Sequence, residues 1–182
     1  MVRDQAGSSF GAMTAAGADR ASQLEVEVTG LFDRWRDPLL GYVTTLGLPL
    51  QEGEEIIQEV FLSLFQHLRS GKPRDNLRGW IFRVGHNLAL KRRYGSGRPL
   101  PGTLDEPRDP GLNPEQALAV KQRQALLQSV VAALPEQDRC CLYLRAEGLR
   151  YREIAEALGM SLGSVAISLG RALERLRRAD RR

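Results

Sequence analysis

The sequence predicts an all-α protein in which a flexible linker joins two small helical domains. Apolar residues recur at intervals of three and four residues in two separate stretches, which is the spacing of one face of a helix. No stretch shows the alternation of apolar and polar residues that is typical of a strand. Between the two stretches, residues 95–114 contain five prolines with glycines among them, a composition that disfavours regular structure.

Composition divides the chain into four segments. Residues 1–22 are rich in glycine, alanine and serine without periodicity, so we expect a disordered, mobile tail. Residues 23–94 form the first helical domain, residues 95–114 the linker, and residues 115–182 the second helical domain. A chain of 182 residues, of which 42% are hydrophobic, is long enough for two such domains.

Three helices are predicted in the first domain. The first begins near Leu24 and contains Pro38, which predicts a kink or a break at that point. The second carries the clearest apolar stripe of the chain and is acidic in its early turns. The third runs from about Leu77 to Tyr94 and ends in a basic cluster. The stripe of the second helix comprises Ile56, Ile57, Val60, Phe61, Leu64, Phe65 and Leu68.

Charge is distributed unevenly along this domain. The whole chain has a formal charge of +4, but residues 67–98 alone contain nine lysines and arginines and a single aspartate. Directly upstream lie four acids, Glu52, Glu54, Glu55 and Glu59. Neighbouring surfaces of opposite sign suit two partners, one of them a polyanion such as nucleic acid. A solvated helix surface with internal ion pairs is the alternative interpretation.

The second domain contains the pattern of a helix-turn-helix that begins at Tyr151. Ala155 is small where two helices must cross closely, and Gly159 can take the left-handed conformation that the tight turn requires. Ser161 is a suitable N-cap for the last helix. The start of that helix would be free to enter a DNA major groove, with arginines following along it. A helical hairpin that does not bind DNA is the alternative interpretation.

Two independent sets of residues resemble the extracytoplasmic-function (ECF) sigma factors of bacterial RNA polymerase. The first domain resembles sigma domain two, the second resembles sigma domain four, and the two occur in the order found in the family. The resemblance covers residues 24–178 apart from the linker. It is carried by QEVF at 58–61, NLRGWI at 76–81 and NLA at 87–89, and then by LPEQDR at 134–139, EGL at 147–149 and the helix-turn-helix.

The resemblance implies a sigma factor that binds core RNA polymerase and promoter DNA and directs promoter recognition, DNA opening and transcription initiation. In the family, the acidic helix of domain two docks on the clamp helices of the largest polymerase subunit, which assigns polymerase binding to Glu55, Gln58 and Glu59. The loop after that helix, here about residues 70–76, captures an unstacked base of the minus-ten element. The contacts implied for minus-ten DNA are Lys72, Arg74, Asn76, Arg78, Arg83, Asn87, Lys91, Arg92 and Arg93.

In the family, domain four places its last helix in the major groove of the minus-thirty-five element. The family often carries a lysine and an arginine early in this helix, whereas Ala166, Ile167 and Ser168 follow Val165 here. We therefore expect weaker base readout by basic side chains, with an unusual promoter preference or a greater reliance on phosphate and protein contacts. The implied contacts are Ser161, Gly163, Ser164, Ser168, Arg171 and Arg175.

Other functional classes have less support in the sequence. His67 and His86 are the only histidines, and the chain shows no nucleophile paired with a base and no phosphate-binding glycine loop. We therefore expect no enzymatic activity, no cofactor and no metal. Cys140 and Cys141 are adjacent and fall in a helical apolar pattern, which favours core packing over a disulfide or a metal site.

The expected setting is the cytoplasm, because the chain shows neither a secretion signal nor a membrane span, and we expect a monomer when the protein is free. An anti-sigma factor is a further expected partner, since members of the family are often held by one. Two rival interpretations stay open. A helix-turn-helix regulator that binds DNA alone would leave the acidic helix unexplained, and a sigma mimic that never initiates transcription is compatible with Ala166 and Ser168.

Overall fold

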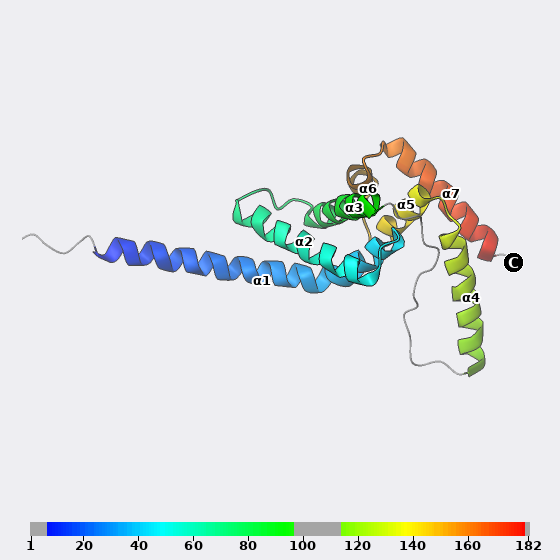
Figure 1. The fold of residues 1–182 in the computed structure, drawn as a ribbon, viewed down its shortest axis with the longest axis horizontal. Helices are drawn as coiled ribbons and strands as arrows, with labels where there is room; N and C mark the ends of the chain where they lie inside the picture. The colour runs from blue at the N-terminus through cyan, green and yellow to red at the C-terminus, as the bar shows by residue number, and fades with distance from the viewer. Residues whose placement is uncertain (1–6, 97–113, 181–182) are drawn as a thin grey trace, which may run out of the picture.

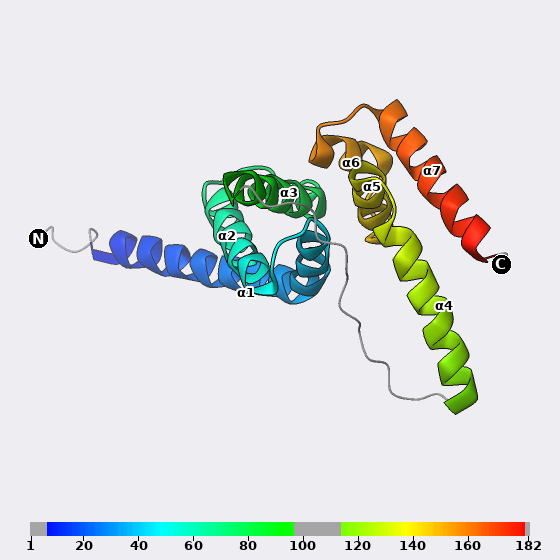
Figure 2. The ribbon, with the colours of Figure 1, turned by 45° about the vertical axis from the view of Figure 1, so that its right-hand side comes forward.

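A computed structural model describes residues 7–96 and 114–180. Over these two ranges the chain forms seven helices and no strand, which confirms the all-α prediction. Figures 1 and 2 show the helices as two groups, α1 to α3 and α4 to α7. The linker predicted for residues 95–114 lies almost entirely outside the described residues.

The first group consists of α1 (Gly7–Thr45), α2 (Leu50–Arg69) and α3 (Leu77–Ser96), which pack around a shared apolar core. The predicted stripe of α2 is buried in this core, with only Phe65 partly exposed. Each buried side chain of this size contributes roughly 1.5–3 kcal/mol relative to an exposed one, so the stripe is a major source of the stability of this group. α2 ends at Arg69 with Ser70 as its C-cap, and Gly71 reverses the chain at a φ of 70°.

The first helix is longer than the sequence predicts. The prediction of a disordered tail through residue 22 is wrong from Gly7 onward, because α1 begins there. Residues 7–22 contain five alanines, the residue with the highest helix propensity, and no proline. Gln23 also donates a hydrogen bond of 3.0 Å to Asp19 one turn earlier. Pro38 does not break the helix either, since α1 continues through it to Thr45.

The second group consists of α4 (Pro114–Ala132), α5 (Glu136–Ala146), α6 (Tyr151–Leu158) and α7 (Leu162–Asp180). α7 packs on α4, α5 and α6, so it connects the other three helices of this group. Gly159 joins α6 to α7 at a φ of 64°, a left-handed conformation that glycine adopts without a steric cost. The predicted helix-turn-helix is therefore confirmed as a local structure.

The two groups pack against each other in this structure. α3 lies on α6, α1 lies on α5, and one buried apolar cluster extends across both groups. The backbone of Gly41 in α1 lies so close to the hydroxyl of Tyr143 in α5 that a Cβ at this position would clash. We call these contacts the interdomain interface, because they determine which candidate binding surfaces are accessible.

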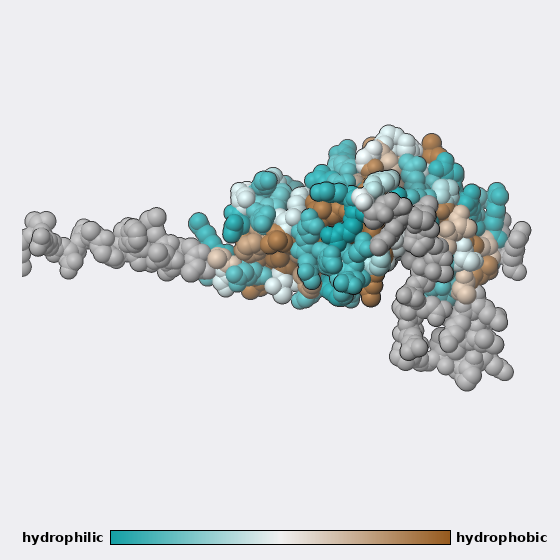
Figure 3. Space-filling model, in the orientation of Figure 1, coloured by the Kyte–Doolittle hydropathy of each residue, from teal (hydrophilic) through white to brown (hydrophobic). Residues whose placement is uncertain are grey.

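The surface carries charged and polar residues over most of the face shown in Figure 3, and the hydrophobic residues on it lie in separate patches. No helix among the described residues is long and apolar enough to cross a membrane. Within the same part of the chain, no cluster of three histidine, cysteine, aspartate or glutamate residues could hold a metal ion. Cys140 and Cys141 are buried free thiols, which confirms that they pack in the core.

Candidate nucleic-acid interface

The acidic face of α2 comprises Glu55, Gln58 and Glu59. It lies opposite the buried stripe of the same helix, because residues at these positions alternate with the core positions at helical spacing. Gln58 and Glu59 are exposed. Glu55 accepts a hydrogen bond of 2.6 Å from Nη1 of Arg92, so a residue predicted for polymerase and a residue predicted for DNA form an ion pair with each other.

The α2–α3 loop, residues 70–76, is exposed along its whole length but is held by specific hydrogen bonds. The His67 ring lies 3.0 Å from the carbonyl oxygen of Pro73 through Nε2. Asn76 has a positive φ of 56°, and its Oδ1 accepts a hydrogen bond of 3.1 Å from the Gly79 amide at the start of α3. Asn76 therefore caps the start of α3. The sequence alone does not distinguish this capping role from a role in DNA contact. Lys72 and Arg74 are exposed on this fixed loop, and Arg74 donates a hydrogen bond of 2.6 Å to Glu27 of α1.

The α3 stripe consists of Arg83, Asn87 and Lys91, which are four residues apart and exposed on one face of α3. These three side chains have no hydrogen bond or ion pair with any residue that the structure describes. Two cations and an amide on a straight helix form a surface that can follow the phosphates of a nucleic-acid strand. The structure thus brings together these three predicted minus-ten residues.

Arg78 and Arg93 are in a different position, because both form ion pairs with the second group of helices. Arg78 donates a hydrogen bond of 3.4 Å to Glu153 of α6 and lies over the Trp35 ring. Arg93 is only 8% exposed and donates hydrogen bonds to the Leu46 carbonyl oxygen at 3.2 Å and to Glu136 of α5 at 2.8 Å. The Arg93 guanidinium is enclosed while the interdomain interface is closed, whereas the Arg78 side chain is paired but remains 30% exposed.

Further polar contacts seal this interface. Arg139 of α5 is buried and donates a hydrogen bond of 3.3 Å to the Thr45 carbonyl oxygen at the end of α1. His86 of α3 is also buried, and its Nδ1 lies 2.8 Å from the hydroxyl of Tyr42 in α1, a contact within the first group of helices. Burial lowers the pKa of His86 from 6.5 to about 4, so the ring is neutral at physiological pH. A cavity of about 270 Å³, lined by His86 and Cys140 among others, lies between α3 and α5.

The helix-turn-helix presents the start of α7 to solvent. Ser161 caps this helix, since its Oγ accepts a hydrogen bond of 3.1 Å from the Ser164 amide and lies 2.9 Å from the Ser164 hydroxyl. Ser161 and Gly163 are exposed, and Ser164 is half-buried. These three predicted minus-thirty-five residues therefore lie together at the end of α7 that a major groove would receive.

The other predicted minus-thirty-five residues interact within the second domain. Ser168 is 1% exposed and faces the core, so its assignment to DNA is wrong for this conformation. It follows Val165 by three residues, so the helical pattern that buries Val165 also buries Ser168. Arg171 binds the fully buried Asp138 carboxylate through two hydrogen bonds of 3.0 and 2.6 Å, and this contact holds the pKa of Asp138 below its usual value. Arg175 donates a hydrogen bond of 3.3 Å to the Ala133 carbonyl oxygen.

Over residues 162–170 of α7, the accessible side chains are small or apolar. Leu162 and Ile167 are 49% and 60% exposed, and Gly163, Ala166 and Gly170 are also exposed. The sequence already shows that basic residues are absent from this part of the helix. The structure adds which of the residues present are exposed. Apolar side chains on a recognition helix contact the C5 methyl group of thymine, which is a readout different from the bidentate pairing of arginine with guanine.

Comparisons with known proteins match both halves of the chain to one kind of protein. The family description "Sigma-70 region 2" matches residues 31–98, which include α2, the α2–α3 loop and α3. The description "Sigma-70, region 4" matches residues 124–176, which include the helix-turn-helix. The two matches together span most of the described chain and occur in the order expected from the sequence.

Individual relatives agree with these family matches. ECF RNA polymerase sigma factor SigE of Mycolicibacterium smegmatis is 34% identical over 69% of this chain, although the match spans only 51% of SigE. ECF RNA polymerase sigma factor ShbA of Streptomyces griseus is 32% identical over 68% of this chain and 67% of its own length.

A solved structure has the same fold. The sigma factor RpoE of Bartonella quintana, in complex with the anti-sigma factor NepR, has a TM-score of 0.63 at 18% identity and covers 85% of this chain and 97% of its own. The resemblance found in the sequence is therefore confirmed across both domains. The chain belongs to the ECF sigma factors of RNA polymerase.

Proposed function

We propose that this chain binds core RNA polymerase in the cytoplasm and directs promoter recognition, DNA opening and transcription initiation. One observation carries the proposal: a region 2 domain and a region 4 domain lie in order on one chain, each with its own accessible polar or DNA-facing surface. A helix-turn-helix regulator that binds DNA alone has no use for the first of these domains. The chain itself needs no catalytic group, because in this proposal the polymerase supplies the chemistry.

The acidic face of α2 supplies the polymerase contact in this proposal. Glu59 and Gln58 are exposed and not engaged by the described part of the chain, so they can meet a basic surface on a partner without first breaking an internal pair. Glu55 must exchange its bond with Arg92 for a bond with the polymerase. That exchange would release Arg92 for DNA, and it links the two surfaces.

The α2–α3 loop and the α3 stripe supply the minus-ten contact. Extrusion of a base costs a few kcal/mol of stacking, which pocket contacts and phosphate contacts must offset. Lys72 and Arg74 lie on a loop that hydrogen bonds already hold in place, so little conformational entropy is lost when DNA binds. Arg83 and Lys91 extend the cationic surface along α3.

α7 supplies the minus-thirty-five contact, with its apolar face in the groove. Ile167 and Ala166 replace basic readout with contact to thymine methyl groups, and Ser161 with Ser164 lies near the backbone of the DNA. Arg171 stabilises the domain through Asp138 and is not needed for base contact in this arrangement.

An anti-sigma factor is the regulatory partner that this proposal includes. RpoE of Bartonella quintana, which shares the fold, was solved in complex with the anti-sigma factor NepR. The interdomain interface of the present chain already buries Arg93 and pairs Arg78 with Glu153, so a partner that stabilises this closed arrangement would withhold part of the DNA surface. Promoter binding through Arg93 requires that the two groups of helices separate.

Charge reversal on α2 tests the polymerase contact. Glu59→Lys should weaken binding of core RNA polymerase about tenfold, which corresponds to about 1.4 kcal/mol, and should weaken transcription equally. Glu59 is exposed, so the fold should be unchanged. Glu25→Lys is the matched control, because Glu25 is an exposed acid on α1 outside the acidic face. Equal affinities for the two variants would remove the acidic face from the proposal.

A further inference from the structure

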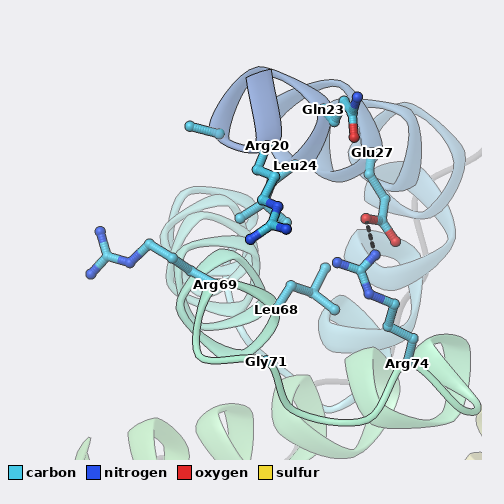
Figure 4. A pocket seen from close by; sticks show the side chains of 9 residues that line it. Arg20, Gln23, Leu24, Glu27, Leu68, Arg69, Gly71 and Arg74 are labelled. Carbon is cyan, nitrogen blue, oxygen red and sulfur yellow. Dashed lines mark hydrogen bonds and ion pairs between the residues drawn. The ribbon is translucent and has the colours of Figure 1, made fainter. Parts of the chain in front are cut away.

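A cleft of about 500 Å³ opens between α1 and the junction of α2 with the α2–α3 loop (Figure 4). Its volume lies within the range of sites that hold small ligands or single groups of larger ones. Three arginines line it from three elements: Arg20 from α1, Arg69 from the end of α2 and Arg74 from the loop. Glu27 is the one acid among the described residues that line it. We call it the arginine cleft.

The two arginines inside the cleft differ in how they are held. Nη1 of Arg74 donates a hydrogen bond of 2.6 Å to Oε2 of Glu27, which fixes this guanidinium against α1. Arg20 points from α1 into the space above Leu68, on the same side as Arg74, and makes no hydrogen bond or ion pair with any residue in the described ranges (Figure 4). Arg69 points outward at the mouth of the cleft. One of the three cations is therefore paired, and the cleft keeps a positive charge.

The floor of the cleft is apolar. Leu24 and Leu68 are 8% and 3% exposed and close it from below. Space remains beside Gly71 at the edge of the cleft, since a Cβ at this position would meet no atom within 4 Å. Cationic walls above an apolar floor match a nucleotide, whose phosphate is anionic and whose sugar carbons and base faces are largely apolar. A metal cation would be repelled by the arginines. An acidic peptide has a polar backbone, which complements the apolar floor less well.

The position of the cleft indicates which nucleotide of the promoter it would bind. It lies directly beside the α2–α3 loop, and Arg74 belongs to both. The geometry points to a phosphodiester-binding site in which Arg20 and Arg74 hold a phosphate of the single strand next to the base captured by the α2–α3 loop. This inference rests on the proposed function. It gives the N-terminal extension of α1 a role in binding the opened strand, because Arg20 lies on that extension.

Neutralisation of single phosphates tests the site in the complete holoenzyme. The holoenzyme is assembled from core polymerase and the full chain, and its affinity is measured for a promoter fragment that it transcribes. Methylphosphonate replaces one phosphate at a time along the non-template strand near the minus-ten element. At one position the replacement should weaken binding by the wild-type protein about tenfold and binding by Arg20→Ala clearly less, since that variant keeps only the Arg74 contact to the phosphate.

Salt dependence and two further variants complete the test. Arg20→Ala should reduce the slope of log affinity against log salt by about one, because one phosphate contact is lost. Arg20→Lys keeps the charge and should keep most of the affinity. Arg34→Ala, which removes another exposed arginine of α1 that does not line the cleft, should bind as the wild type does.

Two outcomes would overturn the inference, and they are distinguishable. If Arg20→Ala binds as tightly as the wild type, or if its loss simply adds to the loss at every methylphosphonate, the cleft holds no phosphate and the proposed function is unaffected. If the wild-type holoenzyme itself fails to bind any promoter, the proposed function and the inference fail together.

Discussion

At the scale of single residues, His86 shows how burial determines chemistry. Its ring is buried among Tyr42 of α1, Glu136 and Cys140 of α5 and Arg93 of its own helix. Burial has the largest effect and lowers the pKa to about 4, and Arg93 acts in the same direction while Glu136 opposes it. The native state therefore holds this ring neutral at a pH where the unfolded chain would protonate it.

The free energy of unfolding should decrease as the pH is lowered through the range in which His86 titrates in the unfolded chain. The unfolded state takes up a proton below about pH 6.5 and the native state only near pH 4, so unfolding becomes easier as the pH falls between these values. We expect a loss of about 2 kcal/mol in the free energy of unfolding from about pH 7.5 to about pH 5. Urea titrations at a series of pH values would measure it. In His86→Gln this loss should shrink to the part due to carboxylates, and an unchanged pH profile would contradict the assignment.

Ile167 carries the prediction for base readout. DNA sequences selected by the holoenzyme should contain a thymine opposite this side chain in the minus-thirty-five element. Replacing that thymine by deoxyuracil removes one methyl group and should weaken binding about fourfold, which corresponds to about 0.8 kcal/mol. Ile167→Ala should be insensitive to the replacement. Leu173→Ala, another exposed apolar residue of α7, should retain the full fourfold effect, and the same sensitivity in all three proteins would exclude methyl readout by Ile167.

At the scale of elements, the start of α6 has half of a capping arrangement. Oε2 of Glu153 accepts a hydrogen bond of 2.6 Å from the Arg150 amide, which satisfies the backbone before the helix. The N-cap residue is Arg150, which forms no side-chain cap hydrogen bond. An arginine has no acceptor, so the reciprocal bond to the amide of the third helical residue is missing.

Arg150→Ser should complete the cap and stabilise the protein by roughly 0.5–1 kcal/mol. The increase should appear as a higher urea midpoint with an unchanged slope. Arg152→Ser, which removes a neighbouring exposed arginine inside the helix, should not stabilise the protein, because serine is a poorer helix former than arginine. A rise in stability for both variants would point to relief of charge repulsion instead of capping.

The elements also show how far the sequence predicts this fold. α2, the helix-turn-helix and the Ser161 cap follow from apolar spacing and turn chemistry, which are local properties. The extension of α1 was missed because glycine and serine among the alanines hide its helix propensity. The burial of Ser168 was available from its distance to Val165. The ion pair of Asp138 with Arg171 could not be predicted from the sequence, because the partners are 33 residues apart and no local pattern connects them.

At the scale of the whole molecule, the interdomain interface decides which DNA surfaces are accessible. Its ion pairs join α3 to α5 and α6 through Arg93 with Glu136 and Arg78 with Glu153. Nothing in the sequence predicts these pairs, since both members look like ordinary surface charges. The acidic face of α2 and the α3 stripe remain accessible in the closed arrangement, so it covers only part of the predicted site.

Loss of the Glu136 carboxylate should open the interface. Glu136→Ala removes the ion pair between Arg93 of α3 and Glu136 of α5, which holds the two groups of helices together, and so favours their separation. Cys140 lines the interdomain cavity and is 3% exposed, so its alkylation rate reports opening. In a Cys141→Ala background we expect Glu136→Ala to raise this rate about tenfold. Glu174→Ala, which breaks only an exposed pair within α7, should leave the rate unchanged. Equal rates for all three proteins would show that Glu136 does not hold the interface closed.

Transcription in vitro tests the central claim most directly. Core RNA polymerase from the source organism is incubated with fragments of that organism's genome, with and without this chain, and the start sites are mapped by sequencing. We expect a defined set of start sites that depends on the chain, with shared minus-ten and minus-thirty-five elements upstream. Binding to core polymerase without any new start site would contradict the claim and would identify the chain as a sigma mimic.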